Sequence, residues 1–131
     1  MKKIPFLFKT AFHTYNLVLI LMYLYPGSIM GWLFYRDIQK QPQLTSDFMI
    51  FSSNHVYAFL VLSLLGIFSY YRKKIKILFL YLFFVSIFLE LSHILIPQRS
   101  FQYQDLFGNF FGVLFSFLSL NLYQLLKSND D

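Results

Sequence analysis

The feature that most constrains this chain is a set of four long apolar stretches separated by short charged segments. They cover approximately residues 11–30, 50–70, 77–96 and 106–126. A transmembrane helix needs about 20 mostly apolar residues to cross roughly 30 Å of hydrocarbon. Each stretch meets that length, and together they use most of the 131 residues. We therefore predict an all-α integral membrane protein, a single domain of four transmembrane helices.

Composition favours lipid over water as the surroundings of this chain. Hydrophobic residues make up 57% of it and charged residues 13%, and a soluble domain of this length could not bury all of its 18 Phe and 10 Tyr. The net charge of +5 comes from short basic clusters, without the continuous stripe typical of nucleic-acid binding. We expect membrane lipids, and no nucleic acid, as partners. The absence of Cys excludes disulfides, thiolate metal sites and catalytic thiols.

The first stretch has a second interpretation. Lys2, Lys3 and Lys9 precede it, as basic residues precede the apolar part of a secretory signal. The stretch is long for a signal, and residues 26–30 contain no small-x-small cleavage pattern. We therefore predict four spans and not three.

The basic residues predict the orientation, because Lys and Arg in short loops stay on the cytoplasmic side. Of the 11 basic residues, eight fall on one side of the predicted spans: Lys2, Lys3, Lys9, Arg72, Lys73, Lys74, Lys76 and Lys127. Arg36, Lys40 and Arg99 fall on the other side. Both termini are therefore predicted to be cytoplasmic, and the loops at 31–49 and 97–105 to lie outside.

Polar residues gather towards the predicted outer ends of the spans. Glu90 lies within the third stretch, His93 follows on the same helix face, and Pro97 is expected to end that helix. A charge at membrane depth costs at least about 2.5–3.5 kcal/mol on insertion scales. Arg99, in the following loop, could supply the cation that Glu90 or Asp105 needs.

The second and fourth stretches carry polar groups at the same predicted end. Asp105 stands where an N-cap of the fourth span is expected, and Asn109 follows four residues later. Gly108 and Gly112 form a small-xxx-small pair, which allows close helix packing. His55 lies near the start of the second stretch. We predict one shared ligand-binding site, made of His55, Glu90, His93, Arg99, Asp105 and Asn109.

Each of these residues also has a purely structural interpretation. Glu90 and Arg99 can form an ion pair that only fixes the helices, and Asp105 can be only an N-cap. The two glycines can serve packing alone. His55 by itself is more typical of a hydrogen-bonded interfacial histidine than of a ligand or a base.

The spacing of these residues carries a family resemblance. The pattern consists of Glu90, His93, Pro97, Arg99, Asp105, Gly108, Asn109 and Gly112. Together with Tyr25 and Pro26, which close the first span, and His55 and Tyr57 in the second, it resembles the VanZ-like family of membrane proteins over nearly the whole chain. The resemblance implies a four-helix protein of the bacterial cytoplasmic membrane. Founding members of that family lower susceptibility to a glycopeptide antibiotic of the teicoplanin type.

Two positions depart from the family pattern. His93 stands where the family usually has glutamine, and residues 52–54 (Ser, Ser, Asn) stand where an aspartate-lysine pair commonly precedes the histidine. Asp47 is a candidate replacement for the missing acid, at a different spacing.

The leading functional hypothesis is action at the outer face of the cytoplasmic membrane on cell-envelope or lipid-linked material, with an effect on glycopeptide susceptibility. The planar cation of Arg99 suits an anionic lipid-linked precursor. Whether the protein is an enzyme stays open; Glu90, His55 and His93 are the candidate acids or bases. This hypothesis assigns no metal and no cofactor.

Two alternatives belong to other classes of function. One is a structural or accessory subunit that binds a membrane partner protein. The other is a metal-dependent membrane hydrolase or transferase with His55, His93, Glu90 and Asp105 as ligands.

Overall fold

The structure, a computed structural model, describes residues 3–71 and 74–129. Over those residues it consists of helices without strands: α1 (Lys3–Leu24), α2 (Ile29–Tyr35), α3 (Ser53–Tyr70), α4 (Ile75–Ser92) and α5 (Tyr103–Asn129). Four of them, all except α2, are long and apolar enough to cross a membrane. The prediction of an all-α protein with four membrane-spanning helices is confirmed.

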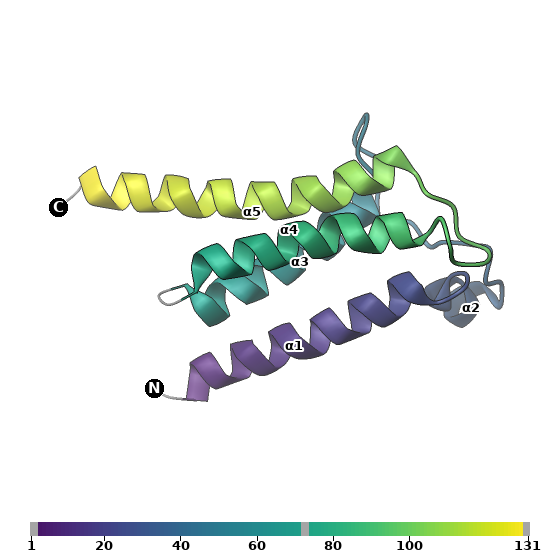
Figure 1. Ribbon diagram of the computed structural model, residues 1–131, viewed down its shortest axis with the longest axis horizontal. Coiled ribbons are helices and arrows are strands. Elements are labelled where there is room, and N and C mark those ends of the chain that lie inside the picture. The colour runs from purple at the N-terminus through teal and green to yellow at the C-terminus, as the bar shows by residue number, and fades with distance from the viewer. Residues whose placement is uncertain (1–2, 72–73, 130–131) are drawn as a thin grey trace.

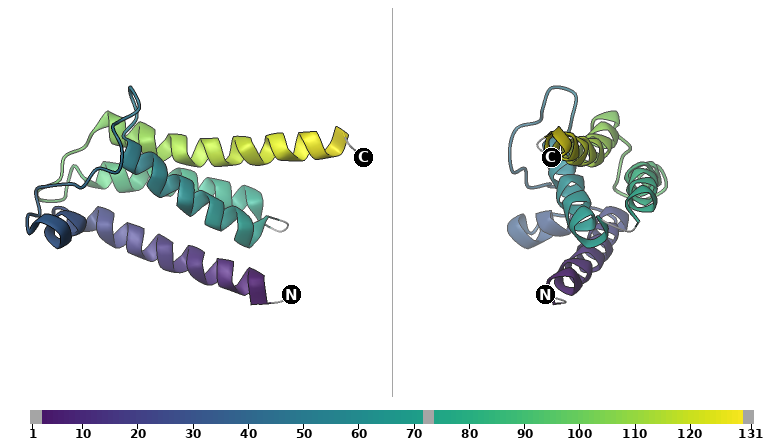
Figure 2. Two further views of the ribbon diagram at one scale, coloured as in Figure 1. Left: turned by 180° about the vertical axis from the view of Figure 1, so that it is seen from behind. Right: turned by 90° about the vertical axis from the view of Figure 1, so that its left-hand side faces the viewer.

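The four long helices run side by side (Figure 1). Viewed along the bundle, α3 is flanked by α1, α4 and α5 (Figure 2), and it packs against all three of them. The first turn of α1, the last turn of α5 and the adjoining ends of α3 and α4 lie at one end of the bundle. The opposite end, here called the loop end, is formed by α2 and residues 36–52 and 93–102. The alternation of the spans therefore brings the two predicted outer loops together.

The orientation of this bundle in the membrane stays a prediction. Lys2, Arg72 and Lys73, which contributed to it, lie outside the described residues. The described chain places Lys74 at the end that holds the termini, and Arg36 and Arg99 at the loop end.

The first span is shifted relative to its prediction, since α1 covers Lys3–Leu24 and not residues 11–30. Pro26 follows directly and lacks an N–H, and Gly27 adopts a left-handed φ of +100°. The chain then starts α2, which was not predicted. The Ser28 hydroxyl caps it by accepting from the Gly31 amide at 2.9 Å. The predicted loop at 31–49 is therefore partly helical.

The third span also ends earlier than predicted. The sequence placed its end at Ile96, before Pro97, whereas α4 ends at Ser92. Beyond that point the backbone bonds join residues three apart, as in His93 N–H to the Glu90 carbonyl at 3.1 Å and Leu95 N–H to the Ser92 carbonyl at 3.0 Å. Such tighter turns are common at helix ends. Glu90 is therefore in the last turn of α4.

The two glycines of α5 bring that helix against α3. A Cβ at Gly112 would lie 2.6 Å from the Val56 carbonyl oxygen, and a Cβ at Gly108 would lie 2.7 Å from that of Ser52. Both neighbours are backbone atoms, so no side chain can move aside. The predicted small-xxx-small packing is confirmed, and it sets Asn109 beside His55.

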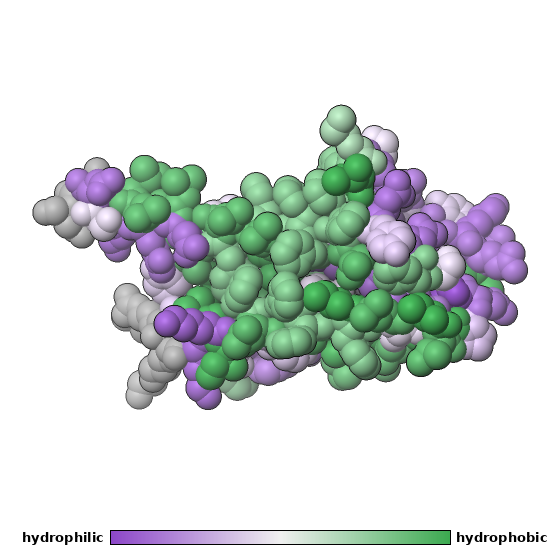
Figure 3. Space-filling view, turned by 45° about the horizontal axis from the view of Figure 1, so that its top comes forward, coloured by the Kyte–Doolittle hydropathy of each residue, from purple (hydrophilic) through white to green (hydrophobic). Residues whose placement is uncertain are grey.

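The surface of the bundle is apolar along most of its length (Figure 3). Phe84 and Phe88, for example, are 65% and 66% exposed on α4, whereas Phe59, Leu62 and Leu82 are fully buried between the helices. Hydrophilic residues gather towards the two ends (Figure 3). Such a surface is stable in hydrocarbon and not in water.

Candidate functional site

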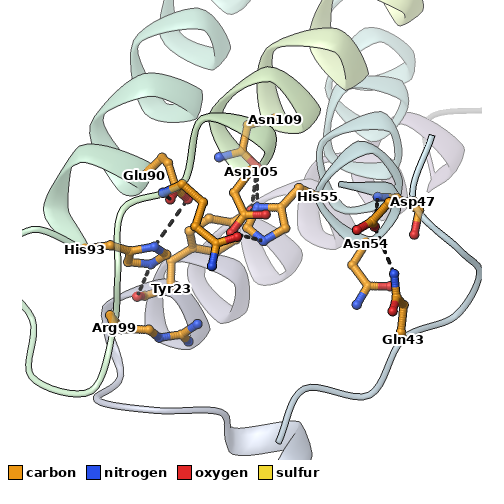
Figure 4. A network of polar contacts seen from close by, with 12 residues as sticks. Tyr23, Gln43, Asp47, Asn54, His55, Glu90, His93, Arg99, Asp105 and Asn109 are labelled. Carbon is orange, nitrogen blue, oxygen red and sulfur yellow. Dashed lines mark hydrogen bonds and ion pairs between the residues drawn. The ribbon is translucent and has the colours of Figure 1, made fainter. Parts of the chain in front are cut away.

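Five of the six predicted site residues meet at the loop end (Figure 4). His55 lies in the first turn of α3 and Glu90 in the last turn of α4. His93 is the first residue after α4, and Asp105 and Asn109 belong to α5. We call these five residues, with Tyr23 of α1, the polar cluster. Glu90 and Asn109 are fully buried, and His93 is 2% exposed.

Tyr23 is the centre of the polar cluster, and the sequence analysis missed it. Its hydroxyl donates to Oδ1 of Asn109 at 2.6 Å and lies 2.7 Å from Nδ1 of His55. Its ring stacks on His93, with centroids 5.5 Å apart and planes at 17°, and its carbonyl oxygen lies 3.0 Å from His93 Nε2. The only signal was a position near the outer end of the first span. The family resemblance included Tyr25 instead, and Tyr25 is 44% exposed.

Glu90 is held by backbone and histidine. Its Oε1 accepts from the Gln102 amide at 3.1 Å, and its Oε2 lies 3.2 Å from Nδ1 of His93. This second contact has an ion-pair distance without hydrogen-bond geometry, and Oε2 has no hydrogen-bond partner among the described residues. The imidazole of His93 therefore lies against Oε2 of Glu90 without a hydrogen bond between them.

Arg99 does not pair with a carboxylate in the described chain, so that expectation is wrong. Its Nε donates to the Tyr25 carbonyl at 3.1 Å and its Nη2 to the Met22 carbonyl at 2.7 Å. The last carbonyls of a helix lack helical partners and carry partial negative charge, which a guanidinium satisfies well. Partial burial lowers the pKa of Arg99, while the negative charges of Glu90 and Asp105 act in the opposite direction.

Asp105 does not occupy the N-cap position that the sequence predicted for it. Because α5 begins at Tyr103, Asp105 lies inside the first turn and not at the N-cap. A carboxylate there is favoured by the positive end of the helix dipole. Its Oδ2 lies 3.5 Å from Nε2 of His55, so a carboxylate–imidazole contact joins α5 to α3.

Asp47 lies in the loop before α3 and Asn54 in the first turn of α3, and neither belongs to the polar cluster (Figure 4). Asp47 Oδ1 accepts from the Ser53 amide at 3.0 Å, at the start of α3, and from Gln43 Nε2 at 2.9 Å. Asn54 accepts from the Leu44 amide at 3.1 Å through its side-chain oxygen. Asp47 therefore supports the start of α3 and does not replace an acid of the cluster.

Two cavities adjoin at the polar cluster, each of about 320 Å³. The first is mostly apolar and lies between α1, α2 and the start of α3, with Leu19, Ile29 and Phe34 in its wall. The second is polar, and carboxamides form much of its wall: Gln39, Gln41, Gln43, Asn54, Gln98, Gln102 and Gln104. Both cavities include His55, His93 and Arg99. Together with Gln41 and Asn54, which also line both cavities, these three residues mark the junction between an apolar and a polar compartment.

The fold and the site together define a class: an all-α protein with four membrane-spanning helices and a buried polar cluster beneath the loops at one end. Comparison with known protein families, with curated proteins and with solved structures gives no match for this chain. Its function is therefore argued from the cluster and its cavities.

Proposed function

We propose that this protein is a VanZ-like protein of the bacterial cytoplasmic membrane that binds a lipid-linked, anionic cell-envelope molecule at the outer face. The observation that carries the proposal is the pair of adjoining cavities that share His55, His93 and Arg99. A lipid-linked molecule has a polar head and an apolar chain, and this site offers a separate compartment for each.

The polar cavity suits a head rich in hydroxyl and amide groups. Carboxamide side chains both donate and accept hydrogen bonds, and the carboxylate of Asp105 adds an acceptor at the base of the cavity. The apolar cavity suits a hydrocarbon chain, because ligand pockets bury apolar groups against apolar walls with few polar contacts.

The position of Arg99 favours a ligand with an anionic group at the junction of the two cavities. Two of its nitrogens are fixed by the carbonyls at the end of α1, which hold the guanidinium plane in place. Its Nη1 makes no hydrogen bond to the described residues, so it keeps donors for a ligand. A phosphate that joins head to chain would lie at this junction, where a planar, pre-oriented guanidinium binds it well.

The outer-face location follows from the predicted charge asymmetry, in which basic residues favour the end with the termini. An effect on glycopeptide susceptibility would then arise from binding the envelope molecule on the side where such antibiotics act. The residue pattern from Glu90 to Gly112 supports the family assignment.

Binding can be followed through the single tryptophan, Trp32, which lies in α2, the helix that contributes Ile29 and Phe34 to the wall of the apolar cavity. Detergent-solubilised protein is titrated with a polyprenyl phosphate and with the matching polyprenol. We expect the phosphate to bind at least tenfold more tightly, and Arg99→Gln to remove that preference. Lys40→Gln, which removes a charge at the same end outside both cavities, should keep it. Equal binding of phosphate and alcohol by the wild-type protein would refute the proposal.

A further inference from the structure

Two carboxylates and an imidazole converge within the polar cluster. One oxygen of Glu90, one oxygen of Asp105 and one ring nitrogen of His55 all lie within 4.8 Å of one another. They come from α4, α5 and α3 respectively. Ligand atoms around a tetrahedral ion at about 2.1 Å are roughly 3.4 Å apart, so the widest separation would close by about 1.4 Å.

Hydrogen bonding decides which ring nitrogen of His55 carries a hydrogen. Asn109 donates through Nδ2 to the Ser86 carbonyl at 3.1 Å, so its Oδ1 is the atom that faces His55. That oxygen only accepts and lies 2.9 Å from Nδ1, so Nδ1 is the donor. In the neutral ring Nε2 then carries a lone pair, 3.5 Å from a carboxylate oxygen of Asp105. A lone pair facing a carboxylate is unfavourable, and either a proton or a metal cation between the two atoms removes the repulsion.

In Glu90 and His93, too, an imidazole nitrogen without a hydrogen faces a carboxylate oxygen. His93 Nε2 lies 3.0 Å from the Tyr23 carbonyl, which only accepts, so Nε2 carries the hydrogen. Nδ1 then faces Oε2 of Glu90 at 3.2 Å. The Glu90 side chain is fully buried, yet its Oε2 has no hydrogen-bond partner among the described residues. A buried carboxylate oxygen without a donor is costly, and a cation would compensate it.

From this geometry we infer that the polar cluster binds one divalent transition-metal ion, with Nε2 of His55 and a carboxylate oxygen each of Glu90 and Asp105 as ligands. One imidazole and two carboxylates suit Zn²⁺, Mn²⁺, Co²⁺ or Fe²⁺. The two carboxylates balance the charge of the ion. The inference does not depend on the proposed lipid-linked ligand, since it concerns only the three side chains and the ion.

The surrounding residues orient the ligands as the outer shell of a metal site does. A metal-bound histidine usually donates its other N–H to a fixed acceptor, and His55 does so to Asn109. Ligating carboxylates are usually hydrogen-bonded as well, and Glu90 accepts from the Gln102 amide. Tyr23 fixes the Asn109 amide oxygen in turn.

Three protein ligands leave one coordination position open, as in catalytic zinc sites. His55 and Asp105 also line the polar cavity, so the open position faces it. A water molecule or a phosphate oxygen of a bound head group would take that position and be polarised by the ion.

The test uses full-chain protein in detergent, purified with a tag that contains no histidine and freed of metal with EDTA. The probe is Co²⁺ alone, followed by its visible absorption, with Zn²⁺ as competitor. We expect one Co²⁺ per chain, displaced by Zn²⁺. Glu90→Gln and Asp105→Asn should each weaken binding by more than about 100-fold, since even outer-shell changes cost about 10–100-fold.

Matched controls keep the result specific to the cluster. Asp47→Asn changes a carboxylate of the loop, and His13→Gln changes a histidine near the opposite end of the bundle, where it contacts Tyr70. Both should bind Co²⁺ as the wild-type protein does. The inference is overturned if folded wild-type protein binds neither ion, if binding survives both Glu90→Gln and Asp105→Asn, or if a control abolishes it. Because no lipid is present, and the lipid titration can be run in EDTA, the two proposals can fail separately.

Discussion

Tyr23→Phe tests the polar cluster most sharply, because it removes one buried oxygen and leaves the ring in place. The hydroxyl makes two contacts, at 2.6 Å to Asn109 and 2.7 Å to His55. Hydrogen bonds between helices in membranes average about 0.6 kcal/mol, and a buried group left without its partner costs about 1–3 kcal/mol. We therefore expect Tyr23→Phe to lower the free energy of unfolding by about 1–3 kcal/mol.

Tyr15 of α1 and Tyr25, the residue after its end, provide controls for this substitution. The Tyr15 hydroxyl donates once, to the Ala58 carbonyl at 3.1 Å, so Tyr15→Phe should cost about 0.6 kcal/mol. The Tyr25 side chain is 44% exposed, and Tyr25→Phe should change stability by less than about 0.5 kcal/mol. Unfolding is measured by circular dichroism in one detergent for all variants. If Tyr23→Phe is no less stable than Tyr25→Phe, the buried network does not exist as described.

Three further substitutions test other parts of the account. Gly112→Leu should lower the free energy of unfolding, measured by thermal unfolding, by about 1–3 kcal/mol or more, because its Cβ would lie 2.6 Å from a backbone oxygen of α3. Gly66→Ala should lower it less, because the added Cβ would meet only side-chain atoms. Asp47→Ala should speed amide hydrogen exchange in the first turn of α3, with a cost of about 0.5–2 kcal/mol, and should leave Co²⁺ binding unchanged. Glu90→Gln should abolish any decrease in teicoplanin-type susceptibility that the wild-type protein confers on a bacterial host, at equal protein levels in the membrane; loss of the protein itself would instead favour a structural role.

The membrane-spanning helices were predictable because hydropathy over 20 residues is a strong and local signal. The same holds for the meeting of Glu90, His55 and Asp105, since alternating spans bring their outer ends to one side. The glycine pair of α5 also allowed the α3–α5 packing to be anticipated. These inferences need only the order of the spans and the positions of the residues along them.

Other features depend on details that a sequence does not carry. Tyr23 points into the cluster and Tyr25 does not, and this depends on the rotation of α1 about its axis. Arg99 was expected beside a carboxylate, but the open carbonyls at the end of α1 hold it instead. That end was not foreseen, because the first span was predicted to run past Pro26. The short helix α2 has too few residues for a periodic pattern to show.

The most direct test of the central claim is the side of the membrane on which the loop end lies. The chain has no Cys, so single cysteines can be introduced without background. Ser100 is exposed in the loop between α4 and α5, and Ser128 is exposed at the opposite end of the bundle. Intact cells are treated with a membrane-impermeant thiol reagent. We predict labelling of Ser100→Cys in intact cells, and of Ser128→Cys only after permeabilisation. Labelling of Ser128→Cys but not Ser100→Cys in intact cells would contradict an outer-face site.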